Sequence, residues 1–378
     1  MRMKIVVAID SFKGSLSSLQ AGNAVKDAIY RLDNNAKVVI KPLADGGEGT
    51  VLALAEGTDS QIVELEVKGP LLKPVTAKYC ILKATNTAVI EMASASGITL
   101  ISEKDKNPLE TTTYGVGELI KDAIEKGCRR FIVGIGGSAT NDGGTGMLTA
   151  LGYQFLDKNG NPILLGAKGL KNLNTIKTDN VLPELKECTF NIACDVTNPL
   201  CGENGCSTVF GAQKGATQEM IKDMDNWLEN YSEIAKAISA KANKYHAGAG
   251  AAGGLGFAFL SFTNAILKSG VDIILQEINL EADIKDADIV VTGEGRLDSQ
   301  TIMGKAPIGV AALAKRYSKK VIAFSGCVTE DTEICNQYGI DAFFPILRNI
   351  TTLPEALDTN NAYKNLTATA YQVFILII

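Results

Sequence analysis

The chain has 378 residues, of which 46% are hydrophobic and 21% charged, and its formal net charge is -5. This length exceeds what one hydrophobic core usually supports, so two domains are expected. The negative charge argues against a nucleic-acid or anionic-membrane surface, because such a surface would need a basic face.

Short apolar runs alternate with amphipathic helical patterns along most of the chain. The apolar runs predict strands at residues 4–9, 37–41, 88–92, 130–133, 190–193, 289–292 and 320–324. Helical periodicity is clearest at residues 19–32, 112–126, 218–242 and 307–316, and a helix apolar on nearly every face is predicted at residues 255–267. Shorter β-rich pieces between residues 60 and 82 indicate a crossing between domains. Strands that alternate with helices form mostly parallel sheets, so the expected fold class is α/β.

The two ends of the chain show no targeting or membrane-spanning pattern. The first apolar run meets Asp10 too early for a signal peptide. The apolar residues 371–378 are far fewer than the ~20 needed to span a bilayer. We therefore expect a cytoplasmic protein.

The cysteines and the histidine restrict the chemistry that the chain can perform. Eight cysteines are spread along the sequence without a Cys-x-x-Cys pair, so neither a zinc site nor a redox motif is indicated. The single histidine, His246, excludes most Ser-His-Asp and Cys-His schemes and is more often structural. Acid–base work would therefore fall to carboxylates or lysine.

Four separate stretches combine glycines with carboxylates and small hydroxyls. They cover residues 43–49, 134–146, 248–256 and 292–299. Backbone N–H groups approach a phosphate closely only where no Cβ intervenes, and glycine also reaches positive-φ conformations. Nearby carboxylates can hold a metal ion and accept a proton, so the pattern favours phosphoryl transfer. For any one stretch alone, a simple turn is an equally good interpretation.

Several of the predicted strands end at a polar or glycine-rich segment. Such segments begin directly after predicted strands, at Asp10, Gly134, Asp195 and Gly293. Open α/β sheets bind ligands beyond the carboxyl ends of their strands, so these segments are expected to converge on one crevice.

A dinucleotide-binding enzyme is the natural rival interpretation. Gly134-Ile-Gly-Gly-Ser-Ala fits G-x-G-x-x-A after a strand, and Asp157 lies near the ~20-residue offset of a ribose-binding carboxylate. However, the loop continues Thr-Asn-Asp-Gly-Gly-Thr-Gly instead of opening directly into a helix. A P-loop kinase is excluded, because Met303-Gly-Lys-Ala lacks both the upstream glycine and the hydroxyl of that motif.

The candidate charged residues each have a functional and a structural interpretation. Asp10 and Lys13 could contact a substrate, or Asp10 could only cap a helix and Lys13 face solvent. Asp195 ends an apolar strand and would serve as a partly desolvated general base. Arg296 could clamp a carboxylate or phosphate beside Glu294 and Asp298, or it could simply pair with Asp298 in a charged turn. Asp45 and Glu48 could be helix-start residues favoured by the macrodipole, but two successive glycines ahead of a helix suggest close approach of a ligand and favour the functional interpretation.

Seven blocks of the chain, in order, resemble the type I glycerate kinases of bacteria. One of them is Gly136-Gly-Ser-Ala-Thr-Asn-Asp-Gly-Gly, and together they cover residues 10–15, 44–50, 113–120, 136–144, 194–200, 248–256 and 292–298. The resemblance implies Mg²⁺- and ATP-dependent phosphorylation of D-glycerate, usually at the 2-hydroxyl. It also implies two α/β domains with the active site in the cleft between them. A Rossmann-like domain with a parallel sheet would comprise residues 1–75 and 280–378, and residues 76–279 would form an inserted second domain.

The residue chemistry and the resemblance together lead to a hypothesis for the roles of individual residues, although the resemblance indicates which residues line the cleft better than it indicates each role. Asp195 would take the proton from the attacking hydroxyl, Lys13 and Arg296 would grip the glycerate carboxylate, and Glu294 and Asp298 would hold the metal. The loops at residues 136–144 and 248–256 would bind Mg²⁺-ATP. The remaining candidates for substrate or nucleotide binding are Asp10, Asp45, Gly136, Gly137, Ser138, Thr140, Asn141, Asp142, Gly250 and Gly253.

Other outcomes stay open at this point. Phosphorylation at the 3-hydroxyl or of a related hydroxy acid, a dinucleotide-binding oxidoreductase and a catalytically idle binding protein are the alternatives. The expected partners are ATP and D-glycerate, with no nucleic acid and no membrane. A homodimer is compatible with the sequence. The apolar residues 371–378 depart from the family's usual polar helix end, which suggests a swapped terminus or a buried helix end.

Overall fold

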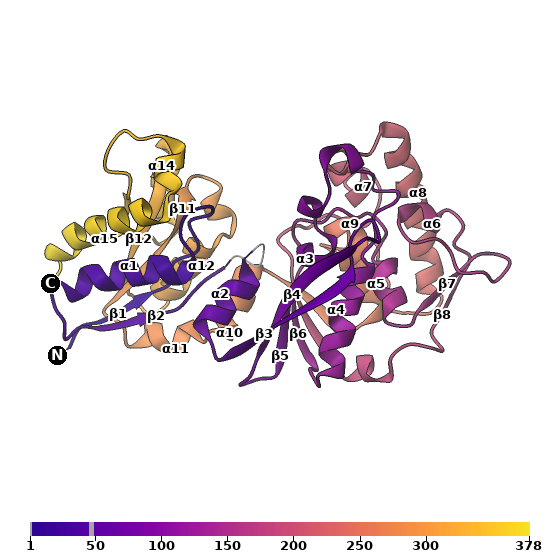
Figure 1. Ribbon diagram of the computed structural model, residues 1–378, viewed down its shortest axis with the longest axis horizontal. Helices are drawn as coiled ribbons and strands as arrows, with labels where there is room; N and C mark the ends of the chain where they lie inside the picture. Colours follow the sequence, from indigo (N-terminus) through magenta and orange to yellow (C-terminus); the bar gives the residue numbers. More distant parts are fainter. Residues whose placement is uncertain (1, 45–48) are drawn as a thin grey trace. The chain divides into compact units, whose positions relative to one another are not determined.

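The structure is a computed structural model that describes residues 2–44 and 49–378 (Figure 1). The chain forms two compact units. Unit 1 comprises Met1–Asp45, Leu52–Asp59 and Val271–Ile378, and unit 2 comprises Gly46–Val51 and Ser60–Gly270. Each unit contains a sheet with parallel strands and helices, so the expected α/β class is confirmed.

The units differ in their limits from the expected boundaries at residues 75/76 and 279/280. Strand β3 (Ser60–Lys68) pairs along its full length with β4 (Pro74–Leu82), and this antiparallel hairpin belongs to unit 2. Helix α10 (Gly270–Glu277) belongs almost wholly to unit 1, where Val271 lies against Gly309. Strand pairing and helix packing thus move both crossings toward the start of the chain.

Unit 1 is built on a five-stranded, wholly parallel sheet. Its strand order is β13-β12-β11-β1-β2. The strands are β1 (Lys4–Val7), β2 (Lys37–Ile40), β11 (Ile289–Leu297), β12 (Lys320–Val328) and β13 (Ala342–Pro345). Counted within the unit, this is the doubly wound order 2-1-3-4-5, whose ligand crevice lies at the switch point between the first and third strands. Here that point lies between the carboxyl ends of β1 and β11.

Helices cover the sheet of unit 1. They are α1 (Ser18–Tyr30), α10, α11 (Leu280–Lys285), α12 (Ala306–Lys315), α13 (Ile334–Gln337), α14 (Leu353–Leu357) and α15 (Thr359–Ile375). Helix α2 (Thr50–Gly57) begins in unit 2 and ends in unit 1. The 3₁₀ turns of unit 1 are Thr301–Met303 and Glu330–Glu333. Helix α1 begins with a capping box in which Ser17 accepts the Gln20 N–H.

The apolar C-terminal run is the last part of α15, which packs against α1 (Figure 1). Val373 and Phe374 are buried in the core of unit 1, whereas Leu376 is exposed. The interpretation as a buried helix end is therefore confirmed for the inward-facing residues.

Unit 2 contains a six-stranded mixed sheet in the order β10-β9-β6-β5-β4-β3. Antiparallel β3 and β4 form one side, and parallel β5 (Thr87–Glu91), β6 (Arg130–Gly134), β9 (Thr189–Ala193) and β10 (Ala265–Lys268) form the other. The stacked rings of Phe131 and Phe190, 4.7 Å apart, lie in its core. A separate hairpin joins β7 (Gln154–Leu156) and β8 (Thr175–Lys177).

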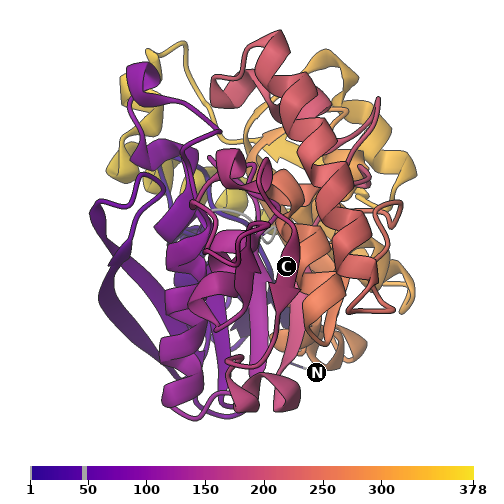
Figure 2. The same cartoon turned by 90° about the vertical axis from the view of Figure 1, so that its right-hand side faces the viewer.

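The helices of unit 2 enclose this sheet. They are α3 (Ala93–Ser96), α4 (Tyr114–Glu125), α5 (Thr145–Ala150), α6 (Ala167–Leu170), α7 (Cys206–Phe210), α8 (Gln218–Lys236) and α9 (Ala251–Phe262), and the 3₁₀ turns are Ile98–Leu100, Glu103–Asp105, Pro183–Glu187 and Ala212–Lys214. In Figure 2 the long α8, in dull red, runs over the outer face of this unit.

One predicted helix is wrong over part of its length. The interval 255–267 was expected to be a single buried helix, but α9 ends at Phe262 and the chain continues as strand β10. Residues 265–268 pair in parallel with β9 and so complete the hydrogen bonding of that strand. The apolar side chains suit both states, and the open edge of the sheet decides between them.

Two further features concern the whole described chain. All eight cysteines are free thiols, and six of them are buried. Within residues 2–44 and 49–378, none of the helices has the length and apolar character needed to cross a bilayer.

The loop after β6 and the start of α9 touch backbone to backbone. Gly143 N–H donates to the Gly253 carbonyl at 2.9 Å. The first turn of α9 departs from helical geometry, because Gly253 and Gly254 both have positive φ. A Cβ on Gly253 would lie 2.0 Å from the Thr140 carbonyl oxygen, so only glycine fits there.

This contact predicts different costs for two glycine substitutions. Gly253→Ala should lower the free energy of unfolding by about 3 kcal/mol, because it combines positive φ with a backbone clash. Gly160→Ala, also at positive φ but with open space around it, should cost only about 1 kcal/mol. Urea denaturation of both variants measures the difference. Equal losses would mean that the contact between the two loops carries no special constraint.

Candidate active site

Asp10 lies at the switch point of the unit 1 sheet, just beyond β1. Its N–H donates to the Gly293 carbonyl at 2.9 Å, and its side chain, which is buried, accepts the Ser11 N–H at 2.6 Å. A Cβ on Gly295 would be 3.4 Å from the Phe12 Cα, so β11 closely approaches the segment that leads to Lys13. Lys13 itself is exposed. The sheet therefore brings residues 10–13 beside β11, as expected from the topology.

Two carboxylates and a lysine gather at the end of β11. Lys305 Nζ lies 3.5 Å from Glu294 Oε2 and 3.7 Å from Asp298 Oδ1. Thr301 donates to Glu294 Oε1 at 2.8 Å. Burial raises the pKa of Glu294, while the Thr301 hydroxyl and the Lys305 ammonium act in the opposite direction. Both carboxylates are mostly shielded from solvent and share one positive charge.

Arg296 pairs with Asp298, with 3.2 Å between Nε and Oδ2. This is the structural interpretation that the sequence left open. The arginine side chain nevertheless remains 62% exposed, and its guanidinium has further donors for an anionic ligand. Over the described ranges, no group of three or more His, Cys, Asp or Glu side chains is arranged to hold a metal ion.

Lys305 was missed by the sequence analysis. The segment Met303-Gly-Lys-Ala was considered only as a failed P-loop. Lys305 is the N-cap residue of α12 and follows Gly304, which has positive φ. A lysine directly after a glycine at the start of a helix is the sequence signal that indicates this site.

In unit 2, only the first part of the loop after β6 is accessible. Gly136 and Gly137 are exposed and Ser138 is half-buried. The loop is anchored by two backbone bonds, from Ile98 N–H to the Gly137 carbonyl at 2.9 Å and from Ala139 N–H to the Ser96 carbonyl at 3.0 Å. In the part of the chain that the structure describes, no acceptor is recorded for the N–H groups of residues 136–138. These three donors are available to an anion.

The second part of the same loop is internal. Asp142 is fully buried and accepts hydrogen bonds from Thr113 N (2.8 Å), Thr113 Oγ1 (3.0 Å), Thr112 Oγ1 (3.2 Å) and Gly144 N (3.1 Å). Burial raises the pKa of Asp142, and these donors oppose the shift. The carboxylate thus fixes the loop against the start of α4 and does not face solvent.

A buried lysine supports this loop through a hydrogen bond to its backbone. Lys214 is 3% exposed, and its Nζ donates to the Thr140 carbonyl at 2.6 Å. Burial lowers the pKa of Lys214 to about 8, although Cys206 and Asp142 act in the opposite direction. The burial of Lys214 cannot be predicted from the sequence, because a lysine in the polar segment Gln213-Lys-Gly is normally solvated.

Two polar side-chain atoms beside Lys214 lack partners. Thr140 Oγ1 and Asn141 Oδ1 are buried and, within the described residues, accept or donate no hydrogen bond. The amide nitrogen of Asn141 donates to Ser207 Oγ at 2.8 Å. Burying a polar atom without a hydrogen bond costs free energy. The presence of these two atoms beneath the exposed loop is therefore more typical of a binding site than of a hydrophobic core.

Asp195 follows β9 at the carboxyl edge of the unit 2 sheet. It is exposed, so the partial desolvation expected from the sequence is not present in this structure. Its Oδ1 accepts the Gly270 N–H at 3.2 Å. The 248–254 loop runs beside the following segment, because Gly250 N–H donates to the Asn198 carbonyl at 2.9 Å.

Gly250 and Gly253 are buried, and their lack of a side chain is explained by close backbone contacts. A Cβ on Gly250 would lie 2.2 Å from the Pro199 carbonyl oxygen, and Gly253 is equally confined by Thr140. Asp45 lies outside the described residues, so the structure says nothing of it. The remaining candidates thus form two groups, one at the strand ends of each unit.

Asp157, the residue on which the dinucleotide interpretation depended, organises a turn. Its carboxylate accepts the N–H groups of Asn159 at 2.8 Å and Asn161 at 2.9 Å, beyond β7. These donors hold the pKa of Asp157 below its usual value. The carboxylate is therefore committed to its own loop, which weakens the oxidoreductase alternative.

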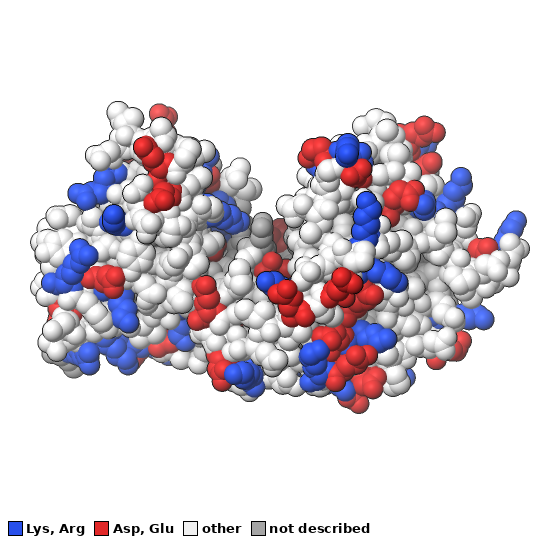
Figure 3. Space-filling view, viewed as in Figure 1, with Lys and Arg blue, Asp and Glu red and all other residues white. Residues whose placement is uncertain are grey.

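Charged side chains are mixed on the surfaces of both units. Figure 3 shows acidic and basic residues interspersed over the face of each unit that it draws. Binding of an anionic ligand would therefore depend on local groups such as the loop donors, Lys13 and Arg296.

Known proteins resemble this chain over nearly its entire length. The model of the glycerate kinase family matches residues 5–378. The chain is 48% identical to the glycerate 2-kinase of Escherichia coli, covering 96% of this chain and 95% of that protein. It is 47% identical to the glycerate kinase of Haemophilus influenzae, covering 98% of each.

A solved structure gives the same result. A crystal structure from Salmonella typhimurium LT2, which bears the provisional description glycerate kinase 2, superposes with a TM-score of 0.93 at 45% identity. The match covers 100% of this chain and 98% of that one. The family match, the sequence identities and the superposition agree, and this chain belongs to the glycerate kinase family.

Proposed function

We propose that this chain is a glycerate kinase that transfers the terminal phosphoryl group of ATP to the 2-hydroxyl of D-glycerate. The observation that carries the proposal is the full-length similarity to named glycerate kinases, one of them a glycerate 2-kinase. The accessible N–H groups of residues 136–138 supply the anion donors that a nucleotide phosphate requires.

The residue roles follow from chemistry. The hydroxyl oxygen of glycerate attacks the terminal phosphorus, the bond from that phosphorus to the bridging oxygen breaks, and ADP leaves. Asp195 takes the hydroxyl proton, since its carboxylate is exposed and held by Gly270. Lys13 and Arg296 bind the carboxylate of glycerate. Loop donors 136–138 bind the phosphates, and Lys214 and Asp142 hold that loop in position.

The oxygen atoms at the end of β11 are our candidate ligands for a magnesium ion. Mg²⁺ prefers carboxylate and hydroxyl oxygens, which Glu294, Asp298 and Thr301 provide. When bound with ATP, the ion would neutralise charge on the phosphates. Lys305 already supplies one positive charge to the same two carboxylates.

The activity is tested by ADP release from Mg²⁺-ATP in the presence of D-glycerate, with enolase added to report 2-phosphoglycerate. We expect ADP release and an enolase signal of equal rate. ADP release without that signal would indicate the 3-hydroxyl or another acceptor. If no ADP forms and NAD⁺ is reduced instead, the proposal fails in favour of an oxidoreductase.

Asp195→Asn should lower kcat by about 100-fold or more and change ATP affinity little, because the amide cannot accept the hydroxyl proton. The amide oxygen can still accept the Gly270 N–H, so the loop should be retained. Steady-state kinetics with ADP detection measures the loss. Asp223→Asn, at an exposed position of α8, is the matched control and should behave as wild type. Near-normal kcat in Asp195→Asn would remove this residue as the base.

Lys214 should produce an alkaline limb in the pH profile of kcat/KM for ATP. Because burial lowers its pKa to about 8, the ammonium is charged below that pH and loses its proton above it, which weakens the bond to Thr140. Lys214→Met should lower kcat/KM about 10-fold at pH 7 and abolish the limb. Lys214→Arg, which stays protonated, should shift the decline to higher pH.

Folding of both Lys214 variants is checked by thermal denaturation. An unchanged limb in Lys214→Met would show that another group titrates. A limb that disappears only in this variant would assign it to the buried lysine.

A further inference from the structure

A second groove lies at the opposite end of the unit 2 sheet from Asp195. It has a volume of about 400 Å³ and is lined in part by Lys186 and Asn264. Lys186 precedes β9 and Asn264 directly precedes β10, so the groove is at the amino ends of these strands. Asp195 follows the carboxyl end of β9. The groove is therefore separate from the candidate active site.

The charged residues that line the groove are all basic. Lysines 186 and 241 line it, and none of its lining residues is Asp or Glu. Lys241 Nζ donates to two uncharged acceptors, the Thr263 carbonyl at 3.1 Å and Asn264 Oδ1 at 3.0 Å. No ion pair of Lys186 is recorded among residues 2–44 and 49–378. Its acidic neighbour Glu187 pairs with Arg129 at 3.0 Å.

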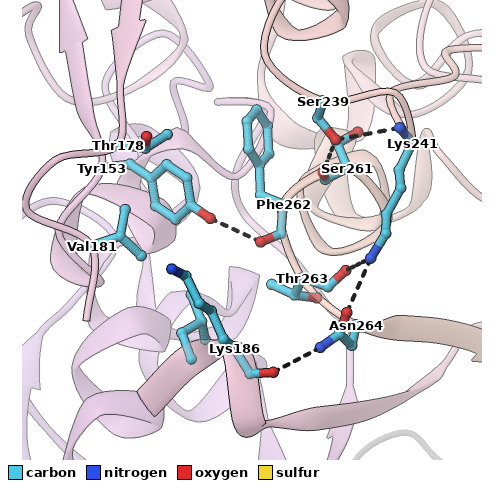
Figure 4. A pocket seen from close by; sticks show the side chains of 11 residues that line it. Tyr153, Thr178, Val181, Lys186, Ser239, Lys241, Ser261, Phe262, Thr263 and Asn264 are labelled. Carbon is cyan, nitrogen blue, oxygen red and sulfur yellow. Dashed lines mark hydrogen bonds between the residues drawn. The ribbon is translucent and has the colours of Figure 1, made fainter. Parts of the chain in front are cut away.

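Figure 4 shows how these groups are arranged. The ammonium of Lys186 points into the space beneath Tyr153, and the ammonium of Lys241, on the other side of Phe262, is directed at Thr263 and Asn264. Two cations that line one hollow without a carboxylate favour an anion there.

The remaining walls offer an apolar surface. The rings of Tyr153 and Phe262 pack edge to face, 5.3 Å apart, and both line the groove. The Tyr153 hydroxyl donates to the Phe262 carbonyl at 2.8 Å, which leaves the carbon faces of these rings for a ligand.

We propose that this groove is a second binding site, which takes a small organic phosphate. Its phosphate group binds Lys186, Lys241 adds positive charge on the other side of the groove, and its carbon skeleton packs against Tyr153 and Phe262. The groove volume lies within the range of small-molecule sites. The inference is independent of the proposed kinase reaction, because it rests only on groups outside the candidate active site.

Phenyl phosphate is the probe, measured by isothermal titration calorimetry on the full chain saturated with Mg²⁺-ADP. The nucleotide occupies the phosphate-binding loop, so further binding reports another site. We expect one equivalent of phenyl phosphate to bind, more tightly than inorganic phosphate, and phenol not to bind. Lys186→Ala should weaken the affinity about 10-fold, because one charge-assisted hydrogen bond is lost. Lys222→Ala, an exposed lysine on α8, should leave it unchanged.

Lys241→Ala should also weaken binding, but it removes two hydrogen bonds that support residues 263 and 264. Lys186→Ala therefore carries the test, and its folding and kinase activity should match wild type. No binding of phenyl phosphate at millimolar concentrations would overturn the proposal. Equal affinity for inorganic and phenyl phosphate would indicate an adventitious ion only, and unchanged affinity in Lys186→Ala would place the ligand elsewhere.

Discussion

The contact between two glycine-rich loops is the constraint on which the site in unit 2 depends. Gly143 and Gly253 meet backbone to backbone at 2.9 Å, and no side chain fits between them. This approach places the Thr140 carbonyl over Lys214 and buries Asp142 among its donors. Within the loop after β6, the same arrangement leaves only residues 136–138 accessible. The glycines thus shape the candidate anion-binding surface indirectly, because most of them pack against protein and few can touch a ligand.

Unit 1 is organised by a different constraint, the order of its parallel strands. Strands β1 and β11 are neighbours in the sheet, but β1 is followed by β2 on one side and β11 by β12 on the other. The segments that directly follow β1 and β11 therefore lie next to each other. Asp10, Glu294 and Arg296 are positioned by this topology. Lys305 enters from the start of the next helix and neutralises part of the negative charge there.

Much of the fold could be predicted from the sequence, because strands buried on both faces are continuous apolar runs. All seven predicted strands are present, although several extend beyond their predicted ends. Residues 265–268 show the limit of this argument, since an apolar run does not reveal that a sheet edge is open. The sequence placed Gly136 and Asp195 at strand ends, but it could not tell that Asp142 is internal. Lys214 escaped prediction because burial of a charge depends on distant segments.

The cysteine side chains have a chemical consequence for the protein. Burial raises the pKa of seven of the eight thiols, for Cys80 to about 12 and for Cys188 and Cys206 to about 11. The thiolate is the form that oxidants and alkylating agents attack, so these sulfurs are poor nucleophiles at neutral pH. These seven thiols should therefore withstand air and mild electrophiles without a protecting reductant.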